Sequence, residues 1–450
     1  MLDFVIFAVT FAVALIVAII YLYPSSKRTT TIPGLDPSSK QDGNLADITR
    51  AGSLHEFLLS LHQQYGSIAS FWMGNTQIVS LASPQLIEAN KKVFDRSSEL
   101  YVLFESLLGS QNLLYASGDE GRQRRSNFVN AFNDEMIAVH CTKLGKISDE
   151  LLTKWSAMSE QHIPVEEHMM ALAMRFQLFK TLGNYFEDNV EILKLRRNFD
   201  TCWNEFEKLL QDLAEPESHR YQAFSDAQAA IETILAKAVQ DHPTDEQIIT
   251  DCFLTLLFDF HTLGGLLTWA LYFLATHGDI QTKLAKEIQT LPEGEPTLED
   301  LRKLKFLKQV LNETYRCAVL NQWSATSQTF DTEIGGHKIP KNTPIINAVG
   351  VLMQDEKYCP LPTQFDPNRF SDEALKSSSS PTAFQPFAFA DKRTRLASDR
   401  IQLYASIHLV YVLRKFRLSL VKGQVVTPVY GLVTHPDDEI WITAAKLHKS

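Results

Sequence analysis

The chain has 450 residues, of which 45% are hydrophobic and 21% charged, and its formal net charge is −10 at pH 7. A protein whose main partner is nucleic acid needs a dominant cationic surface, so this charge argues against that class of function. The five cysteines are scattered and form no CxxC pair. This usage predicts a reducing compartment and no structural zinc site.

The chain begins with a long apolar segment. Phe4–Tyr23 is interrupted only by Thr10, and as a helix it would span about 30 Å, the thickness of a bilayer core. A cleaved signal peptide would need a basic start and a shorter apolar run, whereas Asp3 precedes this one. We therefore predict a transmembrane anchor over residues 4–23. Lys27 and Arg28 just beyond it place the main domain in the cytosol.

Residues 24–50 are predicted to form a linker, which the Pro33-Gly34 pair and Pro37 make into a stiff hinge. From residue 51 onward, no repeat or change of composition marks an internal boundary. We expect one domain over residues 51–450.

Most of this domain has helical periodicity. The predicted helices are Leu54–Tyr65, Pro84–Asn90, Asn130–Trp155, Glu166–Leu182, Val190–Leu213, Gln222–Asp241, Asp251–Ala275, Leu301–Leu311 and Ala397–Lys415. Short strands are predicted at Ser67–Met73, Gln77–Leu81, Glu333–Ile339, Pro344–Val349, Gln424–Val429 and Glu439–Ala444. The expected fold is mainly α, with a large helical body and small β-sheets at its edge.

Asp251–Ala275 is apolar and long enough to cross a membrane, but its middle is polar. Asp259 at a bilayer centre would cost about 2.5 to 3.5 kcal/mol, against gains of only about 0.3 to 0.6 kcal/mol for each Leu or Phe. Asp259 and Thr262 are three residues apart and share a helix face, with His261 between them. A buried helix that carries a carboxylate, an imidazole and a hydroxyl indicates a proton-handling site.

Two segments predict a buried charge cluster. Glu313 and Arg316 have the i,i+3 spacing of a charge pair, and Arg369 lies farther along between a proline and an aromatic residue. If Glu313 and Arg316 are considered without Arg369, an ion pair on the protein surface also explains their spacing. A Glu-Arg-Arg cluster is stable inside a protein only if its members satisfy one another.

The order of these segments is more informative than any one of them. The anchor and hinge are followed by the helix with Thr262 and Trp269, then by Glu-x-x-Arg, Phe365–Phe370 and a Pro-Phe loop that leads into a buried helix. This order resembles the microsomal cytochrome P-450 superfamily over essentially the whole chain. The details that look closest to family 20 are Met1–Phe4, Asp42–Leu45, Gly52–Leu58 and Glu439–Thr443.

The resemblance implies a haem-dependent monooxygenase of the endoplasmic reticulum with haem b as its cofactor. Such a protein acts on small apolar organic substrates and takes electrons from an NADPH-dependent reductase. Glu313, Arg316 and Arg369 would be structural and fix the core behind the haem. Arg125 would meet a haem propionate, although Gly121 stands where the family usually has Trp.

The resemblance also assigns roles to the polar residues of the long helix. With Trp269 in register, Thr262 falls on the threonine that steers protons to bound dioxygen. His261 falls where an acid is usual, and Asp259 where a glycine is usual. The residue types for a proton relay are present but rearranged.

The haem loop departs most from the family. Its pattern falls on Phe387, Lys392 and Thr394, and Thr394 occupies the position of the axial cysteine. No cysteine follows Cys359, which precedes the arginine segment and cannot reach the iron without rethreading. The thiolate favours O–O cleavage by donating electron density to iron. A threonine hydroxyl is a poor replacement.

Two functions therefore remain open. The first is a monooxygenase that receives electrons at a basic face, and the second is a membrane-anchored non-catalytic protein of the same fold that binds a ligand or partner. A basic face would steer an acidic reductase, but the same charges could simply be solvated. The residues that would form it are Arg122, Arg124, Arg125, Lys392, Arg393, Arg395 and Arg400.

Overall fold

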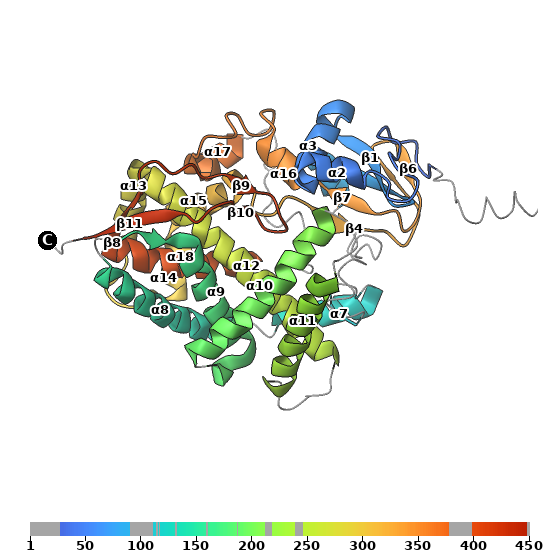
Figure 1. The fold of residues 1–450 in the computed structure, drawn as a ribbon. Coiled ribbons are helices and arrows are strands. Elements are labelled where there is room, and N and C mark those ends of the chain that lie inside the picture. The colour runs from blue at the N-terminus through green and yellow to red at the C-terminus, as the bar shows by residue number, and fades with distance from the viewer. Residues whose placement is uncertain are drawn as a thin grey trace, which may run out of the picture.

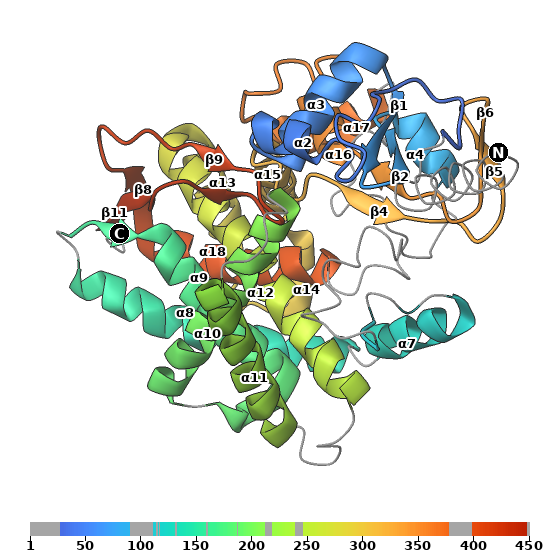
Figure 2. The same cartoon turned by 45° about the vertical axis from the view of Figure 1, so that its right-hand side comes forward.

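The computed structural model describes residues 28–90, 111–113, 116, 118–130, 133–158, 161–186, 188–211, 218–238, 246–377 and 398–447. The predicted anchor and the predicted haem loop both lie outside these residues. Helices dominate the described part, as Figures 1 and 2 show. Their bounds are α2 Leu45–Ala51, α3 Leu54–Tyr65, α4 Pro84–Asn90, α7 Gly118–Asn130, α8 Asp134–Ala157, α9 Val165–Leu182, α10 Asn189–Gln211, α11 Ser218–Ala238, α12 Glu246–Thr276, α13 Gly278–Ile288, α14 Leu298–Lys303, α15 Lys305–Cys317, α16 Val349–Gln354, α17 Asp372–Ser377 and α18 Ser398–Lys415.

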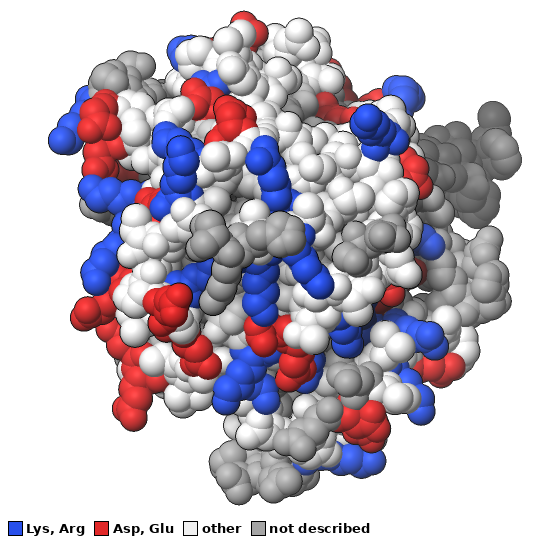
Figure 3. All heavy atoms as spheres, turned by 90° about the vertical axis from the view of Figure 1, so that its left-hand side faces the viewer, with Lys and Arg blue, Asp and Glu red and all other residues white. Residues whose placement is uncertain are grey.

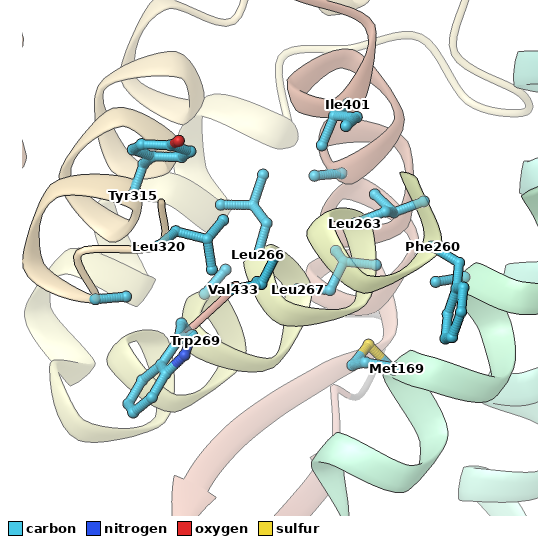
Figure 4. Packing of buried hydrophobic residues seen from close by; sticks show 14 of the residues in the cluster. Met169, Phe260, Leu263, Leu266, Leu267, Trp269, Tyr315, Leu320, Ile401 and Val433 are labelled. Carbon is cyan, nitrogen blue, oxygen red and sulfur yellow. The ribbon is translucent and has the colours of Figure 1, made fainter. Parts of the chain in front are cut away.

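The long helix α12 runs through the centre of the helical body. Its segment Gln247–Thr276 is long and apolar enough to cross a membrane, yet 94% of its most apolar stretch is buried inside the protein. Leu263, Leu266 and Leu267 are fully buried and lie among side chains of α9, α15 and α18 in Figure 4. The hydrophobic residues of α12 therefore build the core of the protein.

Small sheets lie at two edges of the helical body, one beside α2 and α3 and the other beside α8 and α13 (Figure 1). One sheet has the order β1-β2-β7-β4, and another the order β3-β11-β8. Two further pairs, β5-β6 and β9-β10, are antiparallel. The strands are β1 Ile68–Met73, β2 Thr76–Leu81, β3 Ile163–Pro164, β4 Ser324–Thr326, β5 Thr332–Ile334, β6 His337–Ile339, β7 Ile345–Asn347, β8 Phe416–Leu420, β9 Pro428–Val429, β10 His435–Pro436 and β11 Trp441–Lys446.

Several predicted bounds differ from the structure for local reasons. The helix predicted from Asn130 begins at Asp134, because the side chain of Asn133 accepts a hydrogen bond from the Met136 N–H and caps the helix there. The predicted single strand Glu333–Ile339 is a hairpin. Gly335 and Gly336 form its turn at φ of 59° and 81°, a region that favours glycine.

Candidate functional site

A buried charge cluster lies at the end of α15. The sequence predicts that Glu313 and Arg316 follow a helix ending at Leu311, whereas both lie within α15. Arg316 donates two hydrogen bonds to the Glu313 carboxylate, at 2.7 and 2.9 Å. Arg369 Nε lies 3.4 Å from the same carboxylate, and the Asp366 N–H donates to it at 2.8 Å. The carboxylate thus holds α15 against the segment around Arg369.

Cys359 lies near this cluster. It is buried and within electrostatic reach of Arg316, Arg369 and Glu313. Burial raises the pKa of its thiol above the usual value, although both arginines oppose the shift. Cys359 is therefore held as a neutral thiol in the core behind α15.

The middle of α18 carries two other side chains that could bind a metal, Tyr404 and His408, and both contact α8. The Tyr404 hydroxyl lies 3.0 Å from His140 Nδ1, and His408 Nδ1 lies 3.0 Å from the Ser148 hydroxyl. Burial lowers the pKa of His408 to about 3, so its ring is neutral. Both side chains therefore already have polar partners on α8.

The three polar residues in the middle of α12 make separate contacts. Asp259 forms an ion pair with Lys180 of α9, and the two side chains are 12% and 4% exposed. His261 stacks on Trp203 of α10, with the ring centroids 3.7 Å apart and the planes 12° from parallel. The structure therefore directs the carboxylate toward α9 and the imidazole toward α10.

Thr262 bonds within its own helix. Its hydroxyl donates to the Phe258 carbonyl oxygen at 2.8 Å. A threonine hydroxyl commonly makes this i−4 bond when it has no other strong acceptor. Among the described residues, Asp259, His261 and Thr262 thus form no hydrogen-bonded chain with one another.

Arg125 of α7 is 2% exposed, and its Nη1 donates to the Leu113 and Ala116 carbonyl oxygens at 3.4 and 2.8 Å. Gly121 explains this close packing. A Cβ at Gly121 would collide with the Ala116 carbonyl oxygen and lie 2.8 Å from Arg125 Nη2. This backbone leaves no room for the tryptophan that the family usually has there.

The predicted haem-loop residues Phe387, Lys392 and Thr394 lie outside the described residues. The described arginines of the predicted basic face are mostly engaged elsewhere. Arg125 is buried, Arg124 pairs with Asp251 at 2.6 Å, and Arg122 pairs with Asp119. On another face, the left side of Figure 1, basic and acidic side chains are interspersed, as Figure 3 shows.

With this geometry in place, comparisons with known proteins identify the class. The family model "Cytochrome P450" matches residues 41–191 and 170–440, and the chain belongs to the cytochrome P450 family. Its relatives include Cytochrome P450 20A1 of Mus musculus, 35% identical over 100% of both chains. The same-named protein of Homo sapiens is 34% identical over 99% of this chain and 100% of its own. The predicted family, with its likeness to family 20, is confirmed.

A solved structure supports the fold. A crystal structure described as the heme domain of a cytochrome P450DA mutant superimposes with a TM-score of 0.79. It covers 93% of this chain and 98% of its own, at 18% sequence identity. The predicted cytochrome P450 fold, with a helical body and small sheets, is therefore confirmed, whereas the N-terminal membrane helix lies outside the described residues.

The family implies haem as the cofactor, but the donor set of this chain does not fit a haem-thiolate centre. A haem-thiolate centre needs a cysteine, and the predicted haem loop before α18 contains none. Cys359 is buried beside Arg316 and Arg369, while Tyr404 and His408 are engaged with α8. No reaction step through an iron centre follows from these residues.

No pattern in the sequence predicts the partners of the α12 residues. Lys180 lies 79 positions before Asp259, and Trp203 belongs to another helix than His261. Lys180 is one of many lysines, and Trp203 one of many aromatic residues, on amphipathic helices. Only the packing of α9 and α10 against α12 selects them.

Proposed function

We propose that this chain is a membrane-anchored cytochrome P450 that has lost thiolate-dependent monooxygenase chemistry and works by binding a ligand or partner. The observation that carries the proposal is the missing thiolate. No cysteine follows Cys359, and Cys359 itself lies within electrostatic reach of Arg316 and Arg369. A neutral threonine hydroxyl cannot supply the electron donation by which a thiolate favours O–O cleavage.

The environment of α12 supports the same proposal. A proton relay needs groups that exchange protons near the reacting atoms. Asp259 is instead paired with Lys180, and burial lowers the pKa of His261 to about 3. His261 therefore cannot replace an acid as a proton donor near neutral pH.

The alternative is a haem-dependent monooxygenase that oxidises a small apolar substrate with O2 and electrons from an NADPH-dependent reductase. Thr262 favours this function, because it keeps the family's spacing to Trp269. Under either function we place the chain in the endoplasmic reticulum membrane through residues 4–23, with the domain of residues 51–450 in the cytosol.

The full chain in lipid nanodiscs, mixed with an NADPH-dependent reductase, tests the choice. The haem-to-protein ratio and oxidised product from a set of apolar compounds are measured for the native chain and for Thr394→Cys. We expect no product from the native chain above that of the reductase alone, and a higher haem ratio for the variant. NADPH-dependent product from the native chain would support the alternative function.

A further inference from the structure

The loop of the β9–β10 hairpin forms a strap that lies against α10 and α12. We use this name for residues Tyr430–Thr434, which connect β9 to β10. The strap borders a cavity of about 340 Å³ whose other walls come from α9, α10 and α12. Figures 1 and 2 both show this loop next to the end of α10. The two ends of the strap are held in different ways.

One end of the strap is fixed at Thr434, which is fully buried. Its hydroxyl donates to the Val319 carbonyl oxygen at 2.7 Å and accepts from Gln322 Nε2 at 2.7 Å. Its N–H donates to the Leu320 carbonyl oxygen at 3.0 Å, and its own carbonyl oxygen accepts from Trp269 Nε1 at 2.9 Å. Four hydrogen bonds therefore join Thr434 to α12 and to the segment that follows α15.

The backbone of Val319 shows how firmly this end is held. Val319 is buried and has a φ of 48°, a region that a β-branched residue rarely adopts. Such a strained conformation persists only where the surrounding contacts fix it. The bonds from Thr434 to the carbonyl oxygens of Val319 and Leu320 are contacts of this kind. Figure 4 shows Val433, the neighbour of Thr434 in the strap, beside Leu320 and Trp269. Thr434 is therefore a fixed point of the strap.

The other end of the strap is held mainly through one side chain of α10. Oε1 of Glu207 accepts from the Leu432 N–H at 3.0 Å, and its Oε2 lies 3.7 Å from His435 Nε2. Among the described side chains of α10, Glu207 is the one that bonds to the strap. The other polar contacts of this end are longer, 3.4 Å each, and join Asn321 to Leu432 and Gln354 to Tyr430.

The contact between Glu207 and the strap depends on Gly431. A Cβ at this position would lie 2.0 Å from Glu207 Oε1 and 2.6 Å from its Cδ. A residue with a side chain would therefore push the carboxylate away from the Leu432 N–H. Gly431 does not have a positive φ, so glycine is needed here for the close approach and not for the backbone conformation.

From this asymmetry we infer that the strap is a lid that is hinged at Thr434 and latched to α10 by the Glu207 carboxylate. A contact through one carboxylate opens more easily than four hydrogen bonds around a buried threonine, so the movement is confined to Tyr430–Leu432. When the latch opens, a small molecule can reach the side of α12 that lines the cavity. When it is closed, Thr268 on that side is fully buried. The inference concerns a movement of the chain and does not rest on the proposed function.

Two variants open the latch by independent means. Glu207→Ala removes the acceptor of the Leu432 N–H, whereas Gly431→Ala keeps Glu207 and displaces its carboxylate sterically. Gly278→Ala, at the start of α13, is the matched control, because a Cβ there would lie 3.8 Å from the nearest side-chain atom, Arg417 Nη2. Thermal unfolding of each variant confirms that it is folded.

Hydrogen exchange, measured by mass spectrometry on the full chain in nanodiscs, reports the opening of the latch. We expect peptides that cover residues 429–433 and the last two turns of α10 to exchange at least about tenfold faster in both latch variants than in the native chain. Peptides from α8 should exchange at the native rate in these variants, and the whole Gly278→Ala chain should match the native one. No acceleration in either latch variant, or an equal acceleration in α8, would overturn the inference.

A buried thiol reports whether the opening reaches the cavity. Thr268→Cys is introduced into the native, Gly431→Ala and Gly278→Ala chains, and each is treated with methyl methanethiosulfonate, a small neutral thiol reagent. We expect the introduced thiol to react at least about tenfold faster in the Gly431→Ala chain than in the other two. Cys141, which is buried on α8, should react at the same rate in all three. An unchanged rate at the introduced thiol, or an equal acceleration at Cys141, would contradict the lid.

Discussion

Glu166 is the residue whose protonation should matter most near neutral pH. Burial raises the pKa of its carboxyl to about 7; His435 and Arg196 oppose the shift, while Glu439 and Asp200 add to it. Burial alone would lower the pKa of His435, but Glu207, Pro436 and Glu166 raise it overall. Both groups hold their protons more tightly in the folded chain than in the unfolded one.

This difference predicts how stability depends on pH. A carboxyl with a raised pKa stabilises the folded state most at low pH, and its contribution is lost as pH rises from 4.5 through about 7. The contribution of His435 has the same sign and is lost above its usual pKa of 6.5. The combined contribution of Glu166 and His435 to the free energy of unfolding should therefore fall as pH rises from 5.5 to 8. Buried histidines whose pKa is lowered, such as His261 and His408, contribute a change of the opposite sign.

Urea unfolding of the native chain and of Glu166→Gln at several pH values isolates the contribution of Glu166. Glu166→Gln removes this titrating group, so the free energy of unfolding of the native chain should fall relative to that of the variant by on the order of 1 to 2 kcal/mol between pH 5.5 and 8. Glu333→Gln should keep the native pH dependence. If the native chain and Glu166→Gln show the same slope, the assignment of Glu166 is wrong.

At the scale of elements, α9 and α12 are joined by a polar contact inside their apolar interface. The Lys180–Asp259 pair is almost fully buried, so removal of one partner leaves an uncompensated charge. We expect Lys180→Met and Asp259→Asn each to lower the free energy of unfolding by about 3 to 5 kcal/mol. The double variant should lose much less than the sum, because neither charge is then left alone.

Chemical denaturation of the two single variants and the double variant measures this coupling. An exposed ion pair gives the control. Lys415 pairs with Asp149, and their side chains are 39% and 53% exposed, so Lys415→Met should cost no more than about 1 kcal/mol. Additive losses at Lys180 and Asp259 would show that the two charges are not coupled.

The elements also show what a sequence can and cannot predict here. The bounds of α3 and α4 match their predictions because Ser53 caps α3 and Pro84 begins α4, and both are local signals. Glu313 and Arg316 meet because i,i+3 neighbours share a helix face. The contacts of Asp259 and His261 depend on which helix packs against which side of α12. That choice is made by the whole core, so periodicity along α12 could not reveal it.

At the scale of the whole molecule, we propose that residues 4–23 anchor the chain in the membrane, whereas α12 lies in the core of the protein. Although α12 is apolar enough to span a bilayer, it is buried inside the protein. When residues 1–27 are deleted, the chain should therefore no longer be held in the membrane. Extraction of the membranes with alkaline carbonate should then release it into the soluble fraction. Carbonate fractionation of cells that express the full or the shortened chain checks this. If the shortened chain stays fully in the membrane pellet, another segment anchors the protein.

The whole fold is that of a cytochrome P450, and its central exception is the predicted position of Thr394 where the family has its axial cysteine. The most direct measurement is the absorption spectrum of the purified full chain, reduced and exposed to carbon monoxide. We predict that the native chain lacks the Soret band of a haem-thiolate protein and that Thr394→Cys shifts the spectrum toward it. A haem-thiolate band from the native chain would contradict the account.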